Sequence, residues 1–151
     1  MKKLQILLVI CTFVFANSAL ASEGITSLES NYSVKVTADR FEEILKSEGL
    51  TLFARVDHSQ NASTVSLELA PTEVIIFGNP MVGTPLMQCS KTVAIDLPQK
   101  ALFWEDSDGK VFLSYNNPQY LKERHSINGC ESVINQISSV LDKLSKAAVS
   151  K

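Results

Sequence analysis

Two histidines are the residues of this chain best suited to acid–base or metal chemistry. His58 directly follows Asp57, and His125 lies far along the chain, beyond Asp96. An imidazole beside a carboxylate can bind Zn²⁺ or another divalent ion, or transfer protons near neutral pH. The spacing of the two histidines matches no metal-ligand motif, which favours a structural role for each, with hydrogen bonds to loop backbone. A metal-binding protein or small enzyme that uses His58 and His125 with a carboxylate stays the alternative.

Residues 78–85 form the stretch with the most unusual composition, because two glycines and two prolines surround Asn79 and Thr84. A functional interpretation is a ligand-binding loop, in which Asn79 offers an amide, Thr84 a hydroxyl, and the start of a short helix its free N–H groups. The simpler interpretation is a turn and cap that lead a buried strand into a helix, and it is slightly favoured because each residue already suits such a turn.

Two further polar residues complete the candidate site. Asp96 alternates with Val93, Ile95 and Leu97, which predicts that it projects from the opposite face of a sheet. Trp104, Phe112 and Tyr115 are expected to pack beneath helices, with the Tyr115 hydroxyl at the rim of a pocket. The candidate ligand-binding residues are therefore His58, Asn79, Thr84, Asp96, Tyr115 and His125.

Sequence signatures of several enzyme classes are absent from the 151 residues. There is no Gly-x-Ser-x-Gly elbow, phosphate-binding glycine loop, Cys-x-x-Cys-His haem attachment site or His-Glu-x-x-His zinc helix. A catalytic site would have to be assembled from residues far apart in the sequence. No catalytic residue and no cofactor is therefore predicted, and a binding function is favoured over an enzymatic one.

The first 21 residues have the three parts of a secretory signal peptide. Two lysines precede an apolar run of about 12 residues, which is shorter than the roughly 20 needed to span a bilayer. Small residues then precede Ser22, so cleavage is expected after Ala21. We therefore predict a periplasmic or secreted protein, which contacts the membrane only through this leader before cleavage.

Composition and charge limit the rest of the chain to one ordinary globular domain, residues 22–151. Apolar residues make up 45% and charged residues 20% of the sequence. Without the two lysines of the leader, 12 basic residues stand against 16 acidic ones, a net charge of −4. Lys and Arg are scattered singly, and this disfavours a nucleic-acid partner, which needs a concentrated basic face.

Two cysteines, Cys89 and Cys130, remain after removal of the leader. In an oxidising compartment they are expected to form a disulfide, which would stabilise the fold by about 4 kcal/mol in the chain-entropy model. Two buried free thiols are the alternative.

Hydrophobic patterns predict a two-layer α+β domain with both main helices on one face of an antiparallel sheet. A strand at residues 32–36 precedes a helix over 38–48, capped by Thr37 and closed by Gly49. An amphipathic helix is expected to start near Gly129, with an apolar stripe from Val133 to Leu144. The other expected elements are strands at 52–56, 74–77, 92–97, 101–105 and 110–115, an extended piece at 65–69, a polar turn at 59–63, and short helices at 85–90 and 118–124.

Several short motifs also occur in a recognisable order. They are residues 56–58 (Val-Asp-His), 77–80 (Phe-Gly-Asn-Pro), 83–88 (Gly-Thr-Pro-Leu-Met-Gln), 95–98 (Ile-Asp-Leu-Pro), 104–106 (Trp-Glu-Asp), 115–118 (Tyr-Asn-Asn-Pro) and 120–125 (Tyr-Leu-Lys-Glu-Arg-His). Together they resemble the bacterial family called domain of unknown function 302, over about residues 32–140. The resemblance implies a fold similar to the TATA-box-binding protein, strand-helix-four strands-helix, and no specific chemistry.

The favoured hypothesis is an exported accessory domain that binds a small molecule or a protein partner near His58, Asn79, Asp96 and His125. A purely structural module, whose motifs only specify the fold, is a third possibility beside this one and the metal or enzyme alternative.

Overall fold

The structure of the protein is a computed structural model that describes residues 24–151, so the predicted leader and its cleavage site lie outside the described residues. In chain order the elements are β1 (Ile25–Glu29), α1 (Val34–Ser47), β2 (Thr51–Asp57), α2 (His58–Thr64), β3 (Thr72–Gly78), α3 (Pro80–Cys89), the 3-10 helix η1 (Lys91–Ile95), β4 (Gln99–Glu105), β5 (Val111–Asn116), α4 (Pro118–Arg124) and α5 (Glu131–Val149).

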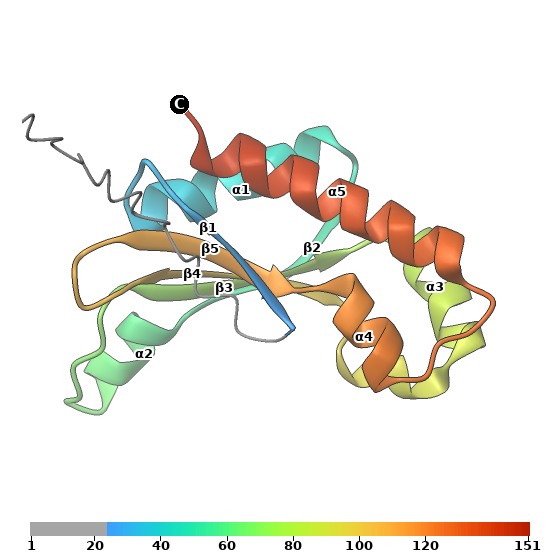
Figure 1. The fold of residues 1–151 in the computed structure, drawn as a ribbon. Coiled ribbons are helices and arrows are strands. Elements are labelled where there is room, and N and C mark those ends of the chain that lie inside the picture. Colours follow the sequence, from blue (N-terminus) through green and yellow to red (C-terminus); the bar gives the residue numbers. More distant parts are fainter. Residues whose placement is uncertain (1–23) are drawn as a thin grey trace, which may run out of the picture.

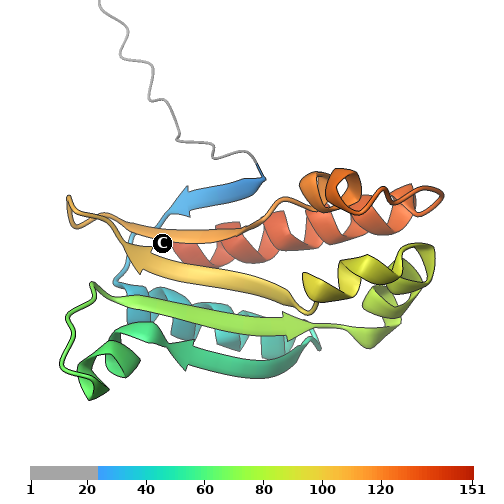
Figure 2. The same cartoon turned by 90° about the horizontal axis from the view of Figure 1, so that it is seen from below.

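The five strands form one antiparallel sheet in the order β1-β5-β4-β3-β2. Helices α1 and α5 lie side by side on one face of this sheet (Figure 1). The opposite face is seen without a long helix across it in Figure 2. This is the predicted two-layer α+β architecture, and the short helices are additions within the connections between its strands. No helix among residues 24–151 combines the length and the apolar character needed to cross a membrane.

The first strand lies earlier in the chain than predicted. Residues 25–29, which read as a polar lead, form β1 and pair with β5. Residues 34–36 belong instead to α1, because the Ser33 side chain caps the helix and accepts a hydrogen bond from the Val36 N–H. Thr37 is therefore inside the helix and not at its cap. The predicted helix end is confirmed, since Gly49 follows it with a φ of 68°.

An extra residue in β2 interrupts the alternation of its side chains between the two faces of the sheet. Leu52 pairs with Phe77, but Ala54 pairs with Ile76, so Phe53 forms a bulge. Beyond a one-residue shift every side chain changes face, so Arg55 lies on the same sheet face as Leu52 and points toward the helices.

Arg55 then ties the sheet to α1 through carboxylates. Its guanidinium contacts Asp39 of α1 at 2.7 Å and Glu73 of β3 at 2.6 Å. Hydrogen bonds from Lys35 and Arg55 lower the pKa of Asp39, and the pKa of Arg55 is raised above its ordinary value, despite desolvation, by Asp39 and Glu73. The charged cluster is thus part of the interface between the two layers.

Four other local predictions are wrong. The polar turn after β2 forms the short helix α2, and the apolar residues Val65, Leu67 and Leu69 lie exposed in the loop that follows it. The strand predicted at residues 92–97 is absent, because residues 91–95 form η1 and Asp96 is its C-cap. Helix α3 begins at Pro80, with Asn79 as its N-cap, so Thr84 lies within the helix.

The remaining elements are confirmed. Strands β3, β4 and β5, the Asp-Gly turn between β4 and β5, and helices α4 and α5 lie where the patterns place them. Phe41 of α1 packs edge-on against Phe77 and Phe103 at the centre of the core. Trp104 and Phe112 stack on each other on the sheet face opposite the helices, and not beneath them as predicted, because they alternate with the buried Phe103 and Leu113.

Candidate functional site

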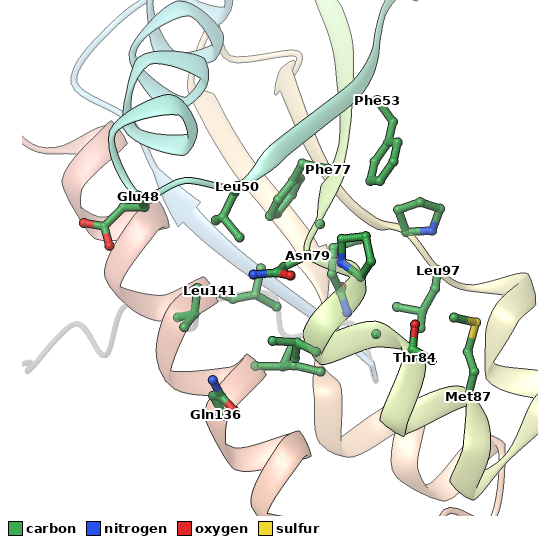
Figure 3. Close-up of a pocket in the computed structure, with 18 residues that line it drawn as sticks. Glu48, Leu50, Phe53, Phe77, Asn79, Thr84, Met87, Leu97, Gln136 and Leu141 are labelled. Atoms are coloured by element: carbon green, nitrogen blue, oxygen red, sulfur yellow. The ribbon is translucent and has the colours of Figure 1, made fainter.

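A cavity of about 390 Å³ opens where the sheet ends between α3 and α5. Its walls come from the end of β3, from α3, from residues 97–99 before and at the start of β4, from Glu48, Leu50 and Phe53 near the start of β2, and from Gln136, Ile137, Val140 and Leu141 of α5. Figure 3 shows the labelled side chains of these segments around the opening. The volume falls within the range of about 300–1,000 Å³ that small-molecule sites occupy.

Most of the wall is apolar. Leu50, Phe77, Met87, Leu97 and Leu141 contribute hydrocarbon, aromatic and thioether surface (Figure 3). None of the lining residues, all of which lie in the described part of the chain, is Lys or Arg. Glu48 supplies a carboxylate, and this carboxylate already pairs with Lys143 of α5 at 2.8 Å. The lining is therefore suited to an uncharged, mainly apolar molecule.

Gln99 is the polar residue of the cavity with an unmet hydrogen-bonding requirement. It is the first residue of β4, pairs with Phe77 and is only 8% exposed. Its side-chain Nε2 is buried and makes no hydrogen bond with any described residue. An unpaired buried donor costs about 1–3 kcal/mol, so such groups usually meet a partner in the functional state.

Two of the predicted site residues, Asn79 and Thr84, line this cavity. The Asn79 Oδ1 accepts a hydrogen bond from the Met81 N–H at 2.9 Å, so this side chain also serves as the cap of α3. Thr84 lies one turn into α3, where Gly83 beside it leaves space toward Leu97. The loop that composition singled out is therefore both a cap, as the simpler interpretation has it, and part of a cavity wall.

The predicted disulfide between Cys89 and Cys130 is present, with 6.5 Å between the two Cα atoms. Cys89 is the last residue of α3, and Cys130 is the N-cap of α5. The bond therefore joins two helices that form opposite walls of the cavity.

His125 and Asp96 lie together, next to one cavity wall. The His125 Nε2 and the Asp96 Oδ2 are 2.5 Å apart, and the His125 Nδ1 lies 3.0 Å from the Thr92 hydroxyl. Arg124 approaches the same carboxylate at 3.5 Å. Asp96 is thus the C-cap of η1 and contacts α4, and it does not project from a sheet face as predicted. Since Leu97 follows it in the chain, this contact holds the cavity wall at residues 97–99 in place.

His58 and Tyr115 lie apart from the cavity. His58 is exposed at the start of α2, at the end of the molecule opposite α4 (Figures 1 and 2), so the structure does not bring it near His125. Among residues 24–151 no three His, Cys, Asp or Glu side chains gather as a possible metal site. Tyr115 is buried in the core, and this burial raises the pKa of its hydroxyl. The structure therefore does not support a site that contains both His58 and His125.

Sequence reasoning missed the residues that define the cavity most sharply. Gln99 shares the inward face of β4 with Ala101 and Phe103, so a polar residue at a core position was a signal that the pattern already contained. The contribution of Gln136 and Val140 from α5 gave no such signal, because Val140 belongs to the long apolar stripe of this helix and Gln136 lies beside the stripe.

A family model described as "Domain of unknown function DUF302" matches residues 26–144. The crystal structure of an uncharacterised conserved DUF302 protein from Bacillus stearothermophilus has a similar fold, with a TM-score of 0.75 and 16% sequence identity. The match covers 84% of this chain and 99% of that one, and at this identity it shows the fold alone.

Two curated relatives carry the name of a fluoride-specific ion channel. FluC 1 of Brucella suis and FluC 1 of Brucella abortus are each 46% identical to this chain over 110 residues, which is 73% of this chain. The aligned region makes up only 43% and 41% of those two proteins, so the chain spans about two fifths of their length.

Proposed function

We propose that this chain, which belongs to the DUF302 family, is an exported protein that binds a small, mainly apolar molecule in the cavity between α3 and α5. The cavity of about 390 Å³ with its largely hydrocarbon lining is the observation that supports this proposal. Burial of apolar ligand surface against such walls provides the binding free energy, at roughly 25 cal/mol per Å² removed from water.

The charge of the lining argues for an uncharged ligand. The side chains that could orient it are the neutral groups Asn79, Thr84, Gln99 and Gln136, beside a carboxylate that is already paired. A bare anion would leave water for a site with no basic side chain in its wall, which is unfavourable. Fluoride, which the names of the curated relatives mention, is therefore not the ligand that we propose for this cavity.

Export is the second part of the proposal. The signal-peptide pattern of residues 1–21 supports it, and so does the Cys89–Cys130 disulfide, because such bonds persist in oxidising compartments. Mass spectrometry of the protein recovered from the periplasm or the medium tests this part of the proposal. We expect the mass of residues 22–151. A protein that stays in the cytoplasm with residues 1–21 still attached would contradict it.

Ligand binding is tested with 4-phenylbutan-2-one, an uncharged molecule with an aromatic ring, a short chain and one carbonyl. Because a ligand that binds only the folded state stabilises it, we expect the melting temperature of the protein to rise by a few degrees at a ligand concentration about 100 times Kd.

Two neighbouring tryptophan substitutions on α5 provide the matched control. Val140 lines the cavity and is 37% exposed, whereas Ser139 is exposed and does not line it. Val140→Trp is expected to fill the opening and abolish the thermal shift, and Ser139→Trp to leave it unchanged. An equal shift in all three proteins, or none in the wild type, would overturn the proposal.

A further inference from the structure

We infer that Gln99 determines which molecules the cavity accepts: its buried amide selects a ligand that carries a hydrogen-bond acceptor, such as a carbonyl or ether oxygen, on an apolar skeleton. This inference rests on the proposed function and assigns the chemical class of its ligand. Gln99 is a lining residue, is 8% exposed, and has its Nε2 buried without a partner in the described chain.

The position of Gln99 in the sheet explains why its side chain forms part of the cavity wall. Gln99 pairs with Phe77 at the end of β3, and both residues line the cavity. On the same face of β4 follow Ala101 and Phe103, which are fully covered by the helix layer. The side chain at position 99 therefore points toward the helix layer at the place where the cavity separates the sheet from the helices. An apolar residue is the usual choice at such an inward position.

The neighbouring polar groups do not meet this requirement. The Asn79 Oδ1 is already bonded to the N–H of Met81, and among the described residues no protein acceptor lies within bonding distance of the Gln99 Nε2. The segment that carries Gln99 is also held, since Asp96 contacts His125 and the Lys100 Nζ donates to the carbonyl oxygens of Asp96 and Pro98. A ligand acceptor can therefore pair with the amide after a rotation of the Gln99 side chain alone, which turns the buried Nε2 toward the cavity while the backbone of this segment stays in place.

The Gln99 donor also disfavours ligands that lack a hydrogen-bond acceptor. A ligand that presents only hydrocarbon to Gln99 leaves the Nε2 unpaired, as it is in the free protein. A ligand with an acceptor gains a hydrogen bond shielded from water, which is worth about tenfold in Kd. The rest of the wall then selects on shape and apolar area alone.

A matched pair of probes isolates this hydrogen bond. In 3-methylbutylbenzene a methyl group replaces the oxygen of 4-phenylbutan-2-one, so the two molecules are similar in shape and differ in the acceptor. The quantity compared is the ratio of their dissociation constants, hydrocarbon over ketone, measured by protein-observed NMR titration on three proteins. These are the wild type, Gln99→Leu, and the control Gln60→Leu, which removes an exposed carboxamide of α2 that does not line the cavity.

We expect the ratio to fall about tenfold in Gln99→Leu and to stay unchanged in Gln60→Leu. Gln99→Leu is also expected to melt at a higher temperature than the wild type without ligand, because it removes an unpaired buried donor. An equal ratio in wild type and Gln99→Leu, or an equal fall in both variants, would overturn the inference while leaving the binding function intact. Failure of both probes to bind the wild type would overturn the proposed function as well.

Discussion

The two ends of the sheet are built in different ways. At one end α2 has no buried residue, and the loop after it exposes Val65, Leu67 and Leu69. At the other end α3, η1, α4 and the start of α5 are joined by the Cys89–Cys130 disulfide and by the contact between His125 and Asp96. Figure 1 shows α2 and the group formed by α3 and α4 at opposite ends of the molecule.

The difference is explained by the cavity. An open space beside the core costs the packing contacts that its lining side chains would otherwise make. The cavity end therefore needs other interactions to stay folded, and a covalent link together with a buried polar contact supplies them. The α2 end relies on local capping, in which the Asp57 side chain accepts from the Gln60 N–H at 2.8 Å.

Of the changes that test this comparison of the two ends, removal of the disulfide should have the largest effect on stability. The double substitution Cys89→Ser and Cys130→Ser is expected to lower the free energy of unfolding by about 4 kcal/mol, because the unfolded chain regains the freedom of a loop with a sequence separation of 41. Urea unfolding measures this loss. Reduction of the wild type should reproduce it and should not affect the double variant. A loss below about 1 kcal/mol would show that the link does not support the cavity end.

Removal of the Asp96 carboxylate should have the next largest effect. Asp96→Ala leaves the largely buried His125 imidazole without its partner, so we expect a loss of about 2 kcal/mol in unfolding free energy. It is also expected to weaken binding of 4-phenylbutan-2-one, since residues 97–99 lose their anchor. Asp108→Asn, in the exposed β4–β5 turn, serves as the control and should change neither quantity. Equal behaviour of the two variants would refute the positioning role of Asp96.

A smaller effect is expected from the cap of α2. Hydrogen bonds from the Ser59 hydroxyl and the Gln60 N–H lower the pKa of Asp57 below its ordinary value of 3.8. The carboxylate therefore stabilises the fold above that value, and this contribution is lost as the pH falls through the lowered pKa of the folded state. Asp57→Ala should cost about 1 kcal/mol at pH 7.

The matched variant Asp57→Asn keeps a capping oxygen but cannot ionise. It should remain close to the wild type at pH 7, and the difference between the two should change below about pH 4. Identical pH profiles of the wild type and Asp57→Asn would exclude the carboxylate as the source.

The smallest effect is expected from His58. It is exposed at the start of α2, so His58→Ala should change the unfolding free energy by less than about 0.5 kcal/mol and should leave ligand binding unchanged. His125→Ala, at the cavity end, provides the contrast because it breaks the contacts with Asp96 and Thr92. Loss of binding in His58→Ala would place the site at the wrong end of the sheet.

Hydrophobic spacing predicted the elements whose own residues determine them. The stripe of α5, the alternation of β3 to β5 and the Asp-Gly turn depend on neighbours within a few residues. Prediction failed where pairing decides the outcome, as at the Phe53 bulge, which exists only because Leu52 and Ala54 pair with adjacent residues of β3. The alternation of apolar and polar residues from 92 to 97 also failed to predict the structure. These residues begin in a 3-10 helix, which buries Val93 and leaves Ile95 74% exposed, whereas a strand would place both on one face.

The candidate site was predicted in part for the same reason. Asn79 and Thr84 stood out by composition, and both line the cavity. The pairing of His125 with Asp96, and the separation of His58 from both, depend on how the short helices fold back on the sheet, which no spacing in the sequence encodes. Gln99 could have been predicted from its position, because it is a polar residue on the otherwise apolar face of β4.

The location of bound 4-phenylbutan-2-one tests the account most directly, and amide chemical shifts recorded during a titration provide it. We predict saturable shifts at Gly83, Leu97, Gln99 and Gln136, with the amides of α2 and of Trp104 on the opposite sheet face unmoved. Shifts confined to α2 or to that opposite face, or no saturable shift at the cavity, would contradict the claim that this space between α3 and α5 is the binding site.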